Sequence, residues 1–201
     1  MTTTIVLASN NKGKIAEFNQ LLSPLGYDVK PQGEYQVEEA VEDGLTFIEN
    51  AILKARNACA QTGLPALADD SGLEVDFLNG APGIYSARFA GEHGNNLANN
   101  QLLLEKLAGV PTLERSARFH CVLAYMRHKD DPTPIVVHGS WEGRILEDLE
   151  GEAGFGYDPV FFVPACGCSA ASLPKEIKNA ISHRAQALTQ LLTHLTSKAS
   201  F

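Results

Sequence analysis

The 201-residue chain has little basic charge, few cysteines and no long hydrophobic run. Lysine and arginine total 16 against 24 acidic residues, so the formal net charge is -8. Phosphate contacts supply most of the affinity of proteins that wrap nucleic acid, and this composition therefore argues against a DNA or RNA partner. A local pocket in which a few lysines and a metal ion converge would still bind a polyanion.

The chain also lacks a segment long and apolar enough for a membrane or a secretion signal. Its start, Met1 to Thr4, has no basic region, and the apolar run from Ile5 to Ala8 is far too short to insert. We therefore expect no membrane partner.

Cysteine is too scarce for a dense disulfide framework in a chain of this length. The four residues are Cys59, Cys121, Cys166 and Cys168. We expect free thiols in a reducing cytoplasm. The Cys166-Gly167-Cys168 segment has no second cysteine pair and no histidine at zinc-finger spacing, so zinc binding is the less favoured alternative.

The overall composition is that of an ordinary globular protein, with 44% hydrophobic and 20% charged residues. We find no repeat, low-complexity tract or linker, which predicts a single domain over residues 1–201. Strand-like and helical periodicities alternate, and this predicts an α/β fold. Strands are expected at 3–8, 27–30, 66–68, 118–127 and 134–141. Helices are expected at 15–25, 46–62, 95–108 and after Ser182, with loops at 36–44, 80–91 and 151–156.

The turn Ser9–Lys14 (Ser-Asn-Asn-Lys-Gly-Lys) lies between the first strand and the first helix. Free backbone N–H groups and the helix dipole attract phosphate at such a position, and the two lysines add positive charge. The segment is not a Walker A loop, because Ala8 and Ile15 replace the required glycine and hydroxyl residue. Taken alone, it fits an ordinary solvated helix N-terminus better.

Asp69 and Asp70 directly follow the apolar strand expected at 66–68. Strand ends in α/β sheets face the ligand crevice, and burying two adjacent carboxylates is costly unless a cation lies beside them. Mg²⁺ prefers oxygen ligands and phosphates, so the pair indicates a magnesium site. The alternative is a simple turn, since Asp and Ser-Gly are common turn formers.

Other charged residues are more ambiguous. Glu42 and Asp43 would supply further metal ligands or form a solvated acidic surface, which is the commoner outcome. Lys54 falls within the helix after Thr46 and is otherwise a surface lysine. Thr46-x-x-Glu49 is a capping box, which explains Glu49 better than catalysis does.

Two segments near the C-terminus suggest recognition of a base. The run 154–159 (Gly-Phe-Gly-Tyr-Asp-Pro) places two aromatic rings among glycines, where a ring can stack on a base or form part of the core. Ser182 is a plausible N-cap of the last helix, so His183 and Arg184 would project from its positive end.

Together these segments resemble the inosine triphosphate pyrophosphatase family, in particular bacterial members that act on dITP and XTP. The resemblance rests on 9–14, 46–51, 68–73, 80–88, 154–159 and 182–184, in shared order and spacing. It implies an elongated, two-lobed α/β fold with a central mixed sheet flanked by helices and a nucleotide cleft between the lobes. It also implies a homodimer and Mg²⁺-dependent hydrolysis of deaminated purine nucleoside triphosphates to the monophosphate and pyrophosphate.

The same resemblance assigns roles by position. Asp70 resembles the family's proton acceptor and metal ligand, while Asp69, Glu42 and Lys54 match positions that support the metal and phosphates. The positions that resemble substrate contacts are Ser9, Asn10, Asn11, Lys12, Gly13, Lys14, Ser71, Phe155, Gly156, Tyr157, Asp158, Lys178, His183 and Arg184. One departure is Val41, which stands where relatives often place an acid and cannot bind a metal.

The expected reaction is metal-assisted hydrolysis, in which Asp70 orients or deprotonates water and Lys12, Lys14 and Lys178 hold the triphosphate. Donors at His183 and Arg184 would donate to the 6-carbonyl of inosine or xanthosine and disfavour the amino group of adenine. There are two alternatives: a phosphatase or pyrophosphatase for another nucleotide, such as a pyrimidine or a modified base, and a nucleotide sensor without turnover. Two carboxylates near a triphosphate would weaken simple binding, which argues against the sensor.

Overall fold

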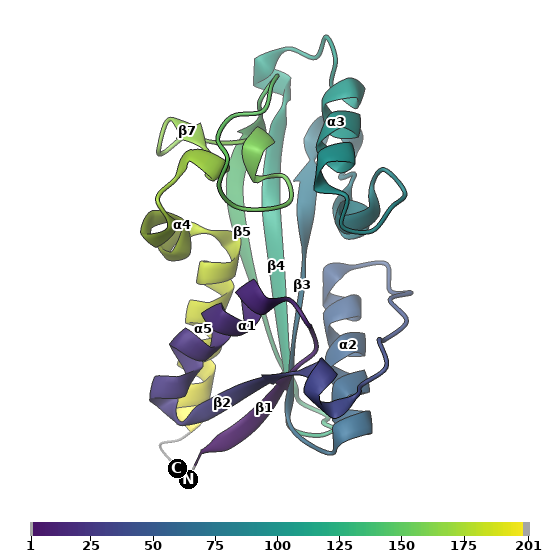
Figure 1. The fold of residues 1–201 in the computed structure, drawn as a ribbon, viewed down its shortest axis with the longest axis vertical. Helices are drawn as coiled ribbons and strands as arrows, with labels where there is room; N and C mark the ends of the chain where they lie inside the picture. The colour runs from purple at the N-terminus through teal and green to yellow at the C-terminus, as the bar shows by residue number, and fades with distance from the viewer. Residues whose placement is uncertain (1, 199–201) are drawn as a thin grey trace. The chain divides into compact units, whose positions relative to one another are not determined.

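The computed structural model describes residues 2–198. They form an α/β fold around a mixed seven-stranded sheet of order β2-β1-β3-β4-β5-β6-β7 (Figure 1). The strands are β1 Thr3–Leu7, β2 Tyr27–Pro31, β3 Ala66–Val75, β4 Ser116–Met126, β5 Ile135–Ile145, β6 Phe161–Val163 and β7 Cys168–Ser169. The helices are α1 Lys12–Leu22, α2 Phe47–Thr62, α3 Asn96–Lys106, α4 Lys175–Ile181 and α5 His183–Lys198. β1 is parallel to β2 and β3, whereas β6 is antiparallel to β5 and β7.

The chain divides into two compact units, each made of separated segments. Unit 1 comprises the chain up to Asp70, residues 122–138 and the chain from Ala187. Unit 2 comprises residues 71–121 and 139–186. The expectation of one domain over 1–201 therefore remains a prediction.

Small side chains let α2 pack closely on the strands of unit 1. Ala51, Ala55 and Cys59 recur at helical spacing and are buried against strand residues such as Val6 and Ala68. Thr46 accepts a hydrogen bond from the Glu49 N–H at 3.1 Å, as a capping box requires. Gly63 ends the helix in the left-handed conformation that glycine adopts readily.

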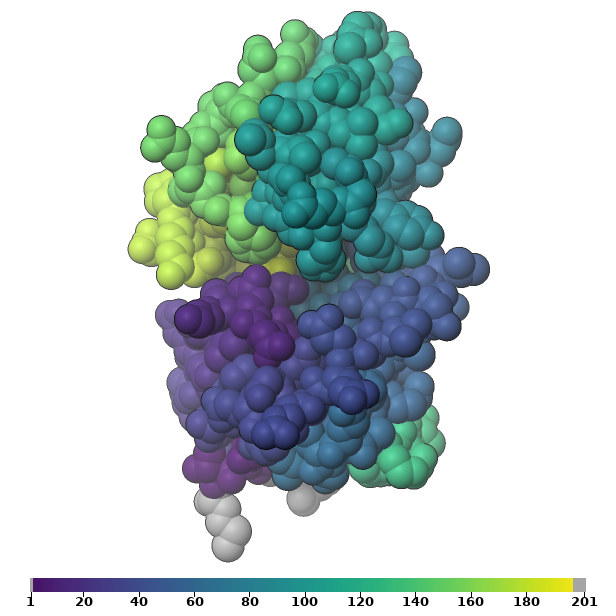
Figure 2. All heavy atoms as spheres, turned by 45° about the vertical axis from the view of Figure 1, so that its right-hand side comes forward, coloured from purple at the N-terminus to yellow at the C-terminus, as the bar shows by residue number. Residues whose placement is uncertain are grey.

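The turn between β4 and β5 also belongs to unit 1 and lies beside α2 (Figure 2). Arg56 Nε of α2 donates to the carbonyl of Lys129 at 3.3 Å. Within the turn, Asp131 is buried and accepts hydrogen bonds from the Arg127 guanidinium and from the Thr133 backbone N–H. The hydrogen bond with Arg127 is the main reason why the pKa of Asp131 lies well below its usual range.

The core of unit 2 is larger and more aromatic. Phe119, Trp141 and Phe161 pack together, with ring centroids 4.5 Å apart for Phe119 and Phe161. Arg115 is buried beside this core and donates to three backbone carbonyls, those of Leu107, Ile145 and Leu146. Its guanidinium thereby satisfies acceptors that would otherwise be buried without partners.

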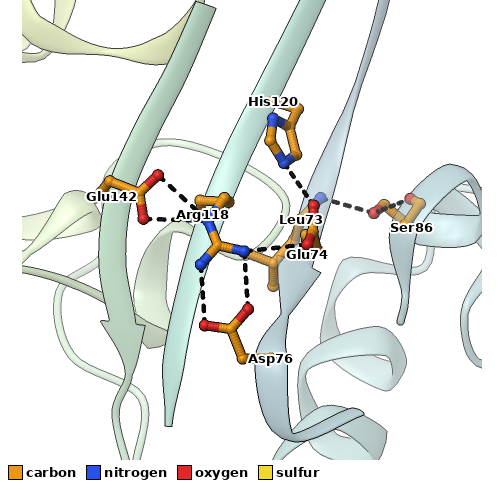
Figure 3. Close-up of polar contacts among 8 residues, drawn as sticks. Leu73, Glu74, Asp76, Ser86, Arg118, His120 and Glu142 are labelled. Carbon is orange, nitrogen blue, oxygen red and sulfur yellow. Dashed lines mark hydrogen bonds and ion pairs between the residues drawn. The ribbon is translucent and has the colours of Figure 1, made fainter. Parts of the chain in front are cut away.

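Polar side chains in unit 2 alternate with these core residues along β3, β4 and β5 (Figure 3). Arg118 ion-pairs with Glu74 at 3.0 Å, Asp76 at 2.8 Å and Glu142 at 3.1 Å. His120 Nε2 lies 2.7 Å from Glu74. The cation at the centre of three carboxylates stabilises charges that would otherwise repel one another.

Most predicted elements are confirmed. The helices expected at 46–62 and 95–108 correspond to α2 and α3, and the strands expected at 118–127 and 134–141 correspond to β4 and β5.

The strand expected at 66–68 is too short. β3 continues to Val75, so Asp69 and Asp70 lie inside a strand rather than after its end. The reason is the neighbouring strand: the parallel β1 pairs only with Ala66 and Leu67, and β3 runs on beyond it beside β4. The two carboxylates therefore lie just past the carboxyl end of β1 without any break in β3.

The sequence analysis did not predict β6, β7 or α4. These elements are short, at three, two and seven residues, so no periodicity develops within them. The expected loop at 36–44 is confirmed. No helix in the described part of the chain combines the length and the apolar character that crossing a bilayer requires.

Candidate functional site

The predicted site residues fall into two groups, one in each unit. The group in unit 1 consists of Ser9, Asn10, Asn11, Lys12, Gly13, Lys14, Glu42, Lys54, Asp69 and Asp70. The group in unit 2 consists of Ser71, Phe155, Gly156, Tyr157, Asp158, Lys178, His183 and Arg184.

Asp70 forms the centre of an acidic cluster with a single lysine. Lys54 Nζ lies 2.6 Å from Asp70 Oδ1 and 3.5 Å from Glu42 Oε2. Helix α2 carries Lys54 on the side that packs against β3, and the side chains of Lys54 and Asp70 are only 14% and 11% exposed. The structure therefore brings together a predicted catalytic carboxylate, a predicted metal ligand and a predicted phosphate ligand.

Asp69 pairs with a lysine of α1 rather than of α2. Lys14 Nζ of α1 lies 2.8 Å from Asp69 Oδ1, and the Asp69 side chain is completely buried. Consecutive side chains of a strand point to opposite faces, which explains why neighbouring carboxylates reach different helices. Each charge has its own lysine, so the mutual repulsion of two buried carboxylates is compensated on both faces.

Burial and charge shift the ionisation of this cluster. Burial raises the pKa of Asp70, against the opposing effect of Lys54. Burial alone would lower the pKa of Lys54, but the carboxylates of Asp70, Glu42 and Asp69 together raise it above its ordinary value. A raised carboxyl pKa makes Asp70 a stronger base than an exposed aspartate, as abstraction of a proton from water requires.

The turn before α1 is held by its own side chains. Asn11 caps the helix, because its Oδ1 accepts from the backbone N–H groups of Gly13 at 2.9 Å and Lys14 at 3.1 Å. Ser9 Oγ accepts from the Asn11 N–H, and Asn10 Oδ1 accepts from the Gly33 N–H. The turn is thus a preformed helix N-terminus, the kind of place where phosphate binds.

The donor chemistry of unit 1 fits a hard divalent cation. Glu42 and Asp70 offer carboxylate oxygens beside the backbone carbonyl of Asp69. Among residues 2–198, no three His, Cys, Asp or Glu side chains are close enough to hold an ion by themselves. Mg²⁺ is usually held by one or two carboxylates together with substrate phosphates, so the two carboxylates of Glu42 and Asp70 would be enough. Val41 is 77% exposed in the preceding loop and contributes no ligand.

In unit 2, the loop from Gly154 to Asp158 presents one aromatic ring and buries the other. Phe155 is 55% exposed, whereas Tyr157 is 4% exposed and donates its hydroxyl to the Ser86 carbonyl at 2.8 Å. Asp158 is buried and accepts from the Phe155 N–H at 2.8 Å. A side chain at Gly154 would collide with the Asp158 carboxylate, so this turn requires glycine.

Two cations lie next to the exposed ring. Lys178 of α4 ion-pairs with Asp158, and its ammonium lies 5.2 Å from the centroid of Phe155. The guanidinium of Arg184 lies 5.8 Å from the same centroid. Both contacts fall within the range of cation–π attraction. Phe155 is therefore a partly exposed ring, contacted by two cations, on which a planar group can stack.

The start of α5 is buried. Ser182 Oγ accepts from the Ala185 N–H at 3.3 Å, which confirms the predicted cap. His183 and Arg184 are 7% and 6% exposed. The His183 ring stacks on Phe119 with centroids 4.8 Å apart, so the aromatic core fixes its orientation.

Sequence reasoning missed two residues that hold the Gly154–Asp158 loop in place. Ser86 Oγ accepts from the Leu73 N–H at 2.8 Å (Figure 3), and the Ser86 carbonyl receives the Tyr157 hydroxyl. Asn100 of α3 donates to the Gly156 carbonyl at 2.9 Å. Ser86 lies in segment 80–88, which carries part of the family resemblance but received no role of its own, whereas Asn100 lies outside every such segment.

The fold is that of an α/β protein. In unit 1, the paired lysine–aspartate contacts beside a helix N-terminus suit a phosphorylated ligand, and in unit 2 the ring flanked by two cations suits a planar group. The chain belongs to the Ham1 family, which matches residues 5–194.

Relatives and solved structures agree with this assignment. A dITP/XTP pyrophosphatase of Vibrio parahaemolyticus is 58% identical over 98% of both chains, and one of Escherichia coli O157:H7 is 60% identical over 95% of this chain and 97% of its own. A HAM1 protein from Coxiella burnetii is 51% identical and superposes with a TM-score of 0.93 over 98% of this chain and 100% of its own. A dITP/XTP pyrophosphatase from Mycobacterium abscessus gives 41% identity and a TM-score of 0.80 over 94% of this chain and 99% of its own.

Proposed function

We propose that this protein hydrolyses deaminated purine nucleoside triphosphates, namely dITP, ITP and XTP, to the monophosphate and pyrophosphate. The observation that carries the proposal is the double pairing on β3, in which Asp70 contacts Lys54 and Asp69 contacts Lys14. It supplies a buried base and two cations next to a preformed helix N-terminus. Relatives almost 60% identical over nearly their whole length are dITP/XTP pyrophosphatases. Such an activity would remove deaminated purines from the nucleotide pool before they enter DNA or RNA.

In this proposal Asp70 accepts a proton from the attacking water, and its raised pKa favours that role. The water oxygen forms a bond to the α- or the β-phosphorus, and the phosphoanhydride bond between them breaks. The leaving group departs with the bonding electrons, and it is pyrophosphate for attack at the α-phosphorus and the monophosphate for attack at the β-phosphorus. Lys12, Lys14 and Lys178 neutralise phosphate charge as it develops. The exposed Phe155 ring would stack on the base.

We further propose that Mg²⁺ is the cofactor and that Glu42 and Asp70 hold it. When bound, the ion would neutralise phosphate oxygens and make phosphorus more electrophilic. The support is the oxygen donor set around Asp70 and the preference of Mg²⁺ for a few carboxylates plus phosphates.

Base selection would come from the start of α5. His183 and Arg184 are buried, and Arg184 lies against the Phe155 ring, where a stacked base would lie. Donors at this place would pair with the 6-carbonyl of inosine or xanthosine and would face the amino group of adenine. A site built around hydrogen bonds rejects a mismatched base strongly, because its buried donors lose their partners.

Assembly and location follow as proposals from the family resemblance. We propose a homodimer that works in the cytoplasm, where its four free cysteines would stay reduced. Light scattering at micromolar concentration tests the assembly, and a monomer alone would contradict it.

A pyrophosphate-release assay over a nucleotide panel tests the function. We expect turnover of dITP, ITP and XTP in the presence of Mg²⁺, and turnover lower by orders of magnitude for ATP, GTP and the pyrimidine triphosphates. A preference for another nucleotide would indicate a pyrophosphatase with a different substrate. Binding of ITP without release of pyrophosphate would point to a sensor.

A further inference from the structure

The ammonium of Lys54 lies where three oxygen atoms of unit 1 converge. Its Nζ is 2.6 Å from Asp70 Oδ1, 3.1 Å from the backbone carbonyl of Asp69 and 3.5 Å from Glu42 Oε2. Two of these oxygens belong to the side chains that we propose as metal ligands. A lysine therefore contacts the same carboxylates that a divalent ion would need.

We propose that Lys54 is the resident countercation of this centre and competes with the divalent metal for Asp70 and Glu42. The substrate-free protein would then bind the metal weakly and acquire it together with the nucleotide. The inference rests on the proposed function only for the identities of the metal and of the triphosphate.

Charge supports the competition. Two carboxylates and one ammonium give the trio Glu42, Asp70 and Lys54 a formal net charge of about -1. A lysine that stayed in place would repel an incoming divalent cation at short range in a mostly buried site. A tightly held metal therefore requires the ammonium to move.

A triphosphate provides a destination for the displaced ammonium. Lysine carries its charge on a flexible four-carbon stem, so the ammonium can turn from Asp70 to a phosphate oxygen without movement of the helix. The nucleotide would then favour metal binding, and by linkage the metal would favour nucleotide binding to the same extent. If Lys54 formed only a structural ion pair, its ammonium would not move to a phosphate, and metal and nucleotide would not strengthen each other's binding through it.

The test measures metal binding to the protein without turnover. Mn²⁺ serves as the probe, because its free form gives an electron paramagnetic resonance signal that is lost on binding. We would titrate the wild type, Lys54→Met and Lys30→Met. The Lys30 variant is the matched control, since Lys30 is also in unit 1 and pairs with Asp28 at 3.3 Å in a more exposed setting.

We expect Lys54→Met to bind Mn²⁺ at least about tenfold more tightly than the wild type, within the usual range of coupling between sites. Lys30→Met should match the wild type. An α,β-methylene analogue of ITP, which cannot be cleaved at that bridge, should tighten Mn²⁺ binding to the wild type more than to Lys54→Met. Lys54→Gln provides a second variant, and circular dichroism melting establishes that each variant is folded.

A gain below tenfold in both Lys54 variants would overturn the inference, as would an equal gain in Lys30→Met, which would indicate a general charge effect. Thermal melting gives an independent readout: Mn²⁺ should raise the Tm of Lys54→Met more than that of the wild type. The titrations without nucleotide do not depend on turnover of ITP. Failure of the proposed function would instead appear as absence of pyrophosphate release, with the metal titrations unaffected.

Discussion

Asp69 and Asp70 are neighbours in β3, yet their carboxylates pair with lysines on different helices, Lys14 of α1 and Lys54 of α2. The alternation of side chains along a strand produces this separation. One consequence is that the two residues differ in accessibility, because the Asp69 side chain is fully buried while that of Asp70 is 11% exposed. This difference supports the proposal that Asp70 is the base, and it fits a role for Asp69 in holding the Lys14 ammonium in place.

Asp70→Asn should abolish turnover of ITP and leave the fold intact. The change nearly preserves volume but removes the base, and a general base typically contributes about 10²–10⁴-fold. Steady-state pyrophosphate release at saturating Mg²⁺ measures the loss. Asp130→Asn, at an exposed carboxylate of the β4–β5 turn, is the control and should be fully active. Retention of more than about a tenth of wild-type activity would exceed what removal of a general base allows.

Phe155→Ala and Tyr157→Phe should separate the two aromatic residues of the same loop. Loss of the exposed Phe155 ring should raise KM for ITP by about tenfold, since base–aromatic stacking contributes roughly 1–3 kcal/mol. Tyr157→Phe removes only the hydroxyl that donates to Ser86 and should cost about 1–2 kcal/mol of unfolding free energy with little change in KM. Steady-state kinetics and denaturant unfolding of both variants test this. A raised KM in Tyr157→Phe with an unchanged KM in Phe155→Ala would assign stacking to Tyr157.

Arg184→Ala should reduce turnover of ITP far more than the already poor turnover of ATP. The buried guanidinium beside Phe155 is the proposed donor to the 6-carbonyl, and such a contact can discriminate by roughly 10⁴. The ratio of the two kcat/KM values should therefore fall toward one. Arg144→Ala is the control, because Arg144 also lies over a phenylalanine, Phe162, in unit 2. A ratio that stays at its wild-type value would place selectivity elsewhere, for example in the Phe155 loop.

Asp131→Asn should lower the unfolding free energy by about 2 kcal/mol near neutral pH, because it removes a buried acceptor of charged and backbone donors. The pKa of Asp131 is depressed in the folded protein, so its contribution is fully present above the unfolded pKa of about 3.9 and is lost progressively as pH falls from there through the folded pKa. In urea unfolding from pH 7 to pH 3, the difference between the wild type and the variant should stay constant down to about pH 4 and then begin to narrow. A constant difference across this range would contradict the charge-based account.

The sequence predicted the elements that carry strong local patterns. The helix that begins after Thr46 has a capping box in the sequence, and the structure confirms it. The last helix begins at its predicted serine cap. Local hydrogen bonds and periodicity determine such features, so one sequence suffices to find them.

The sequence could not predict features that depend on distant pairing. The length of β3 depends on its pairing with β1 and β4. The buried Tyr157 donates its hydroxyl to a carbonyl 71 positions earlier in the chain. The lysine partners of Asp69 and Asp70 lie 55 and 16 residues away. The sequence identified these residues as candidates, but only the fold shows which lysine neutralises which carboxylate.

The division of the chain into interleaved segments constrains how the protein is made. Unit 1 contains the first strand and also the chain from Ala187, whose Leu188 and Leu191 are buried. Because synthesis proceeds from the N-terminus, β1 must wait for the segment that begins at Ala187 before unit 1 is complete. A premature stop before Ala187 would therefore release a chain in which β1, α1 and α2 lack part of their core.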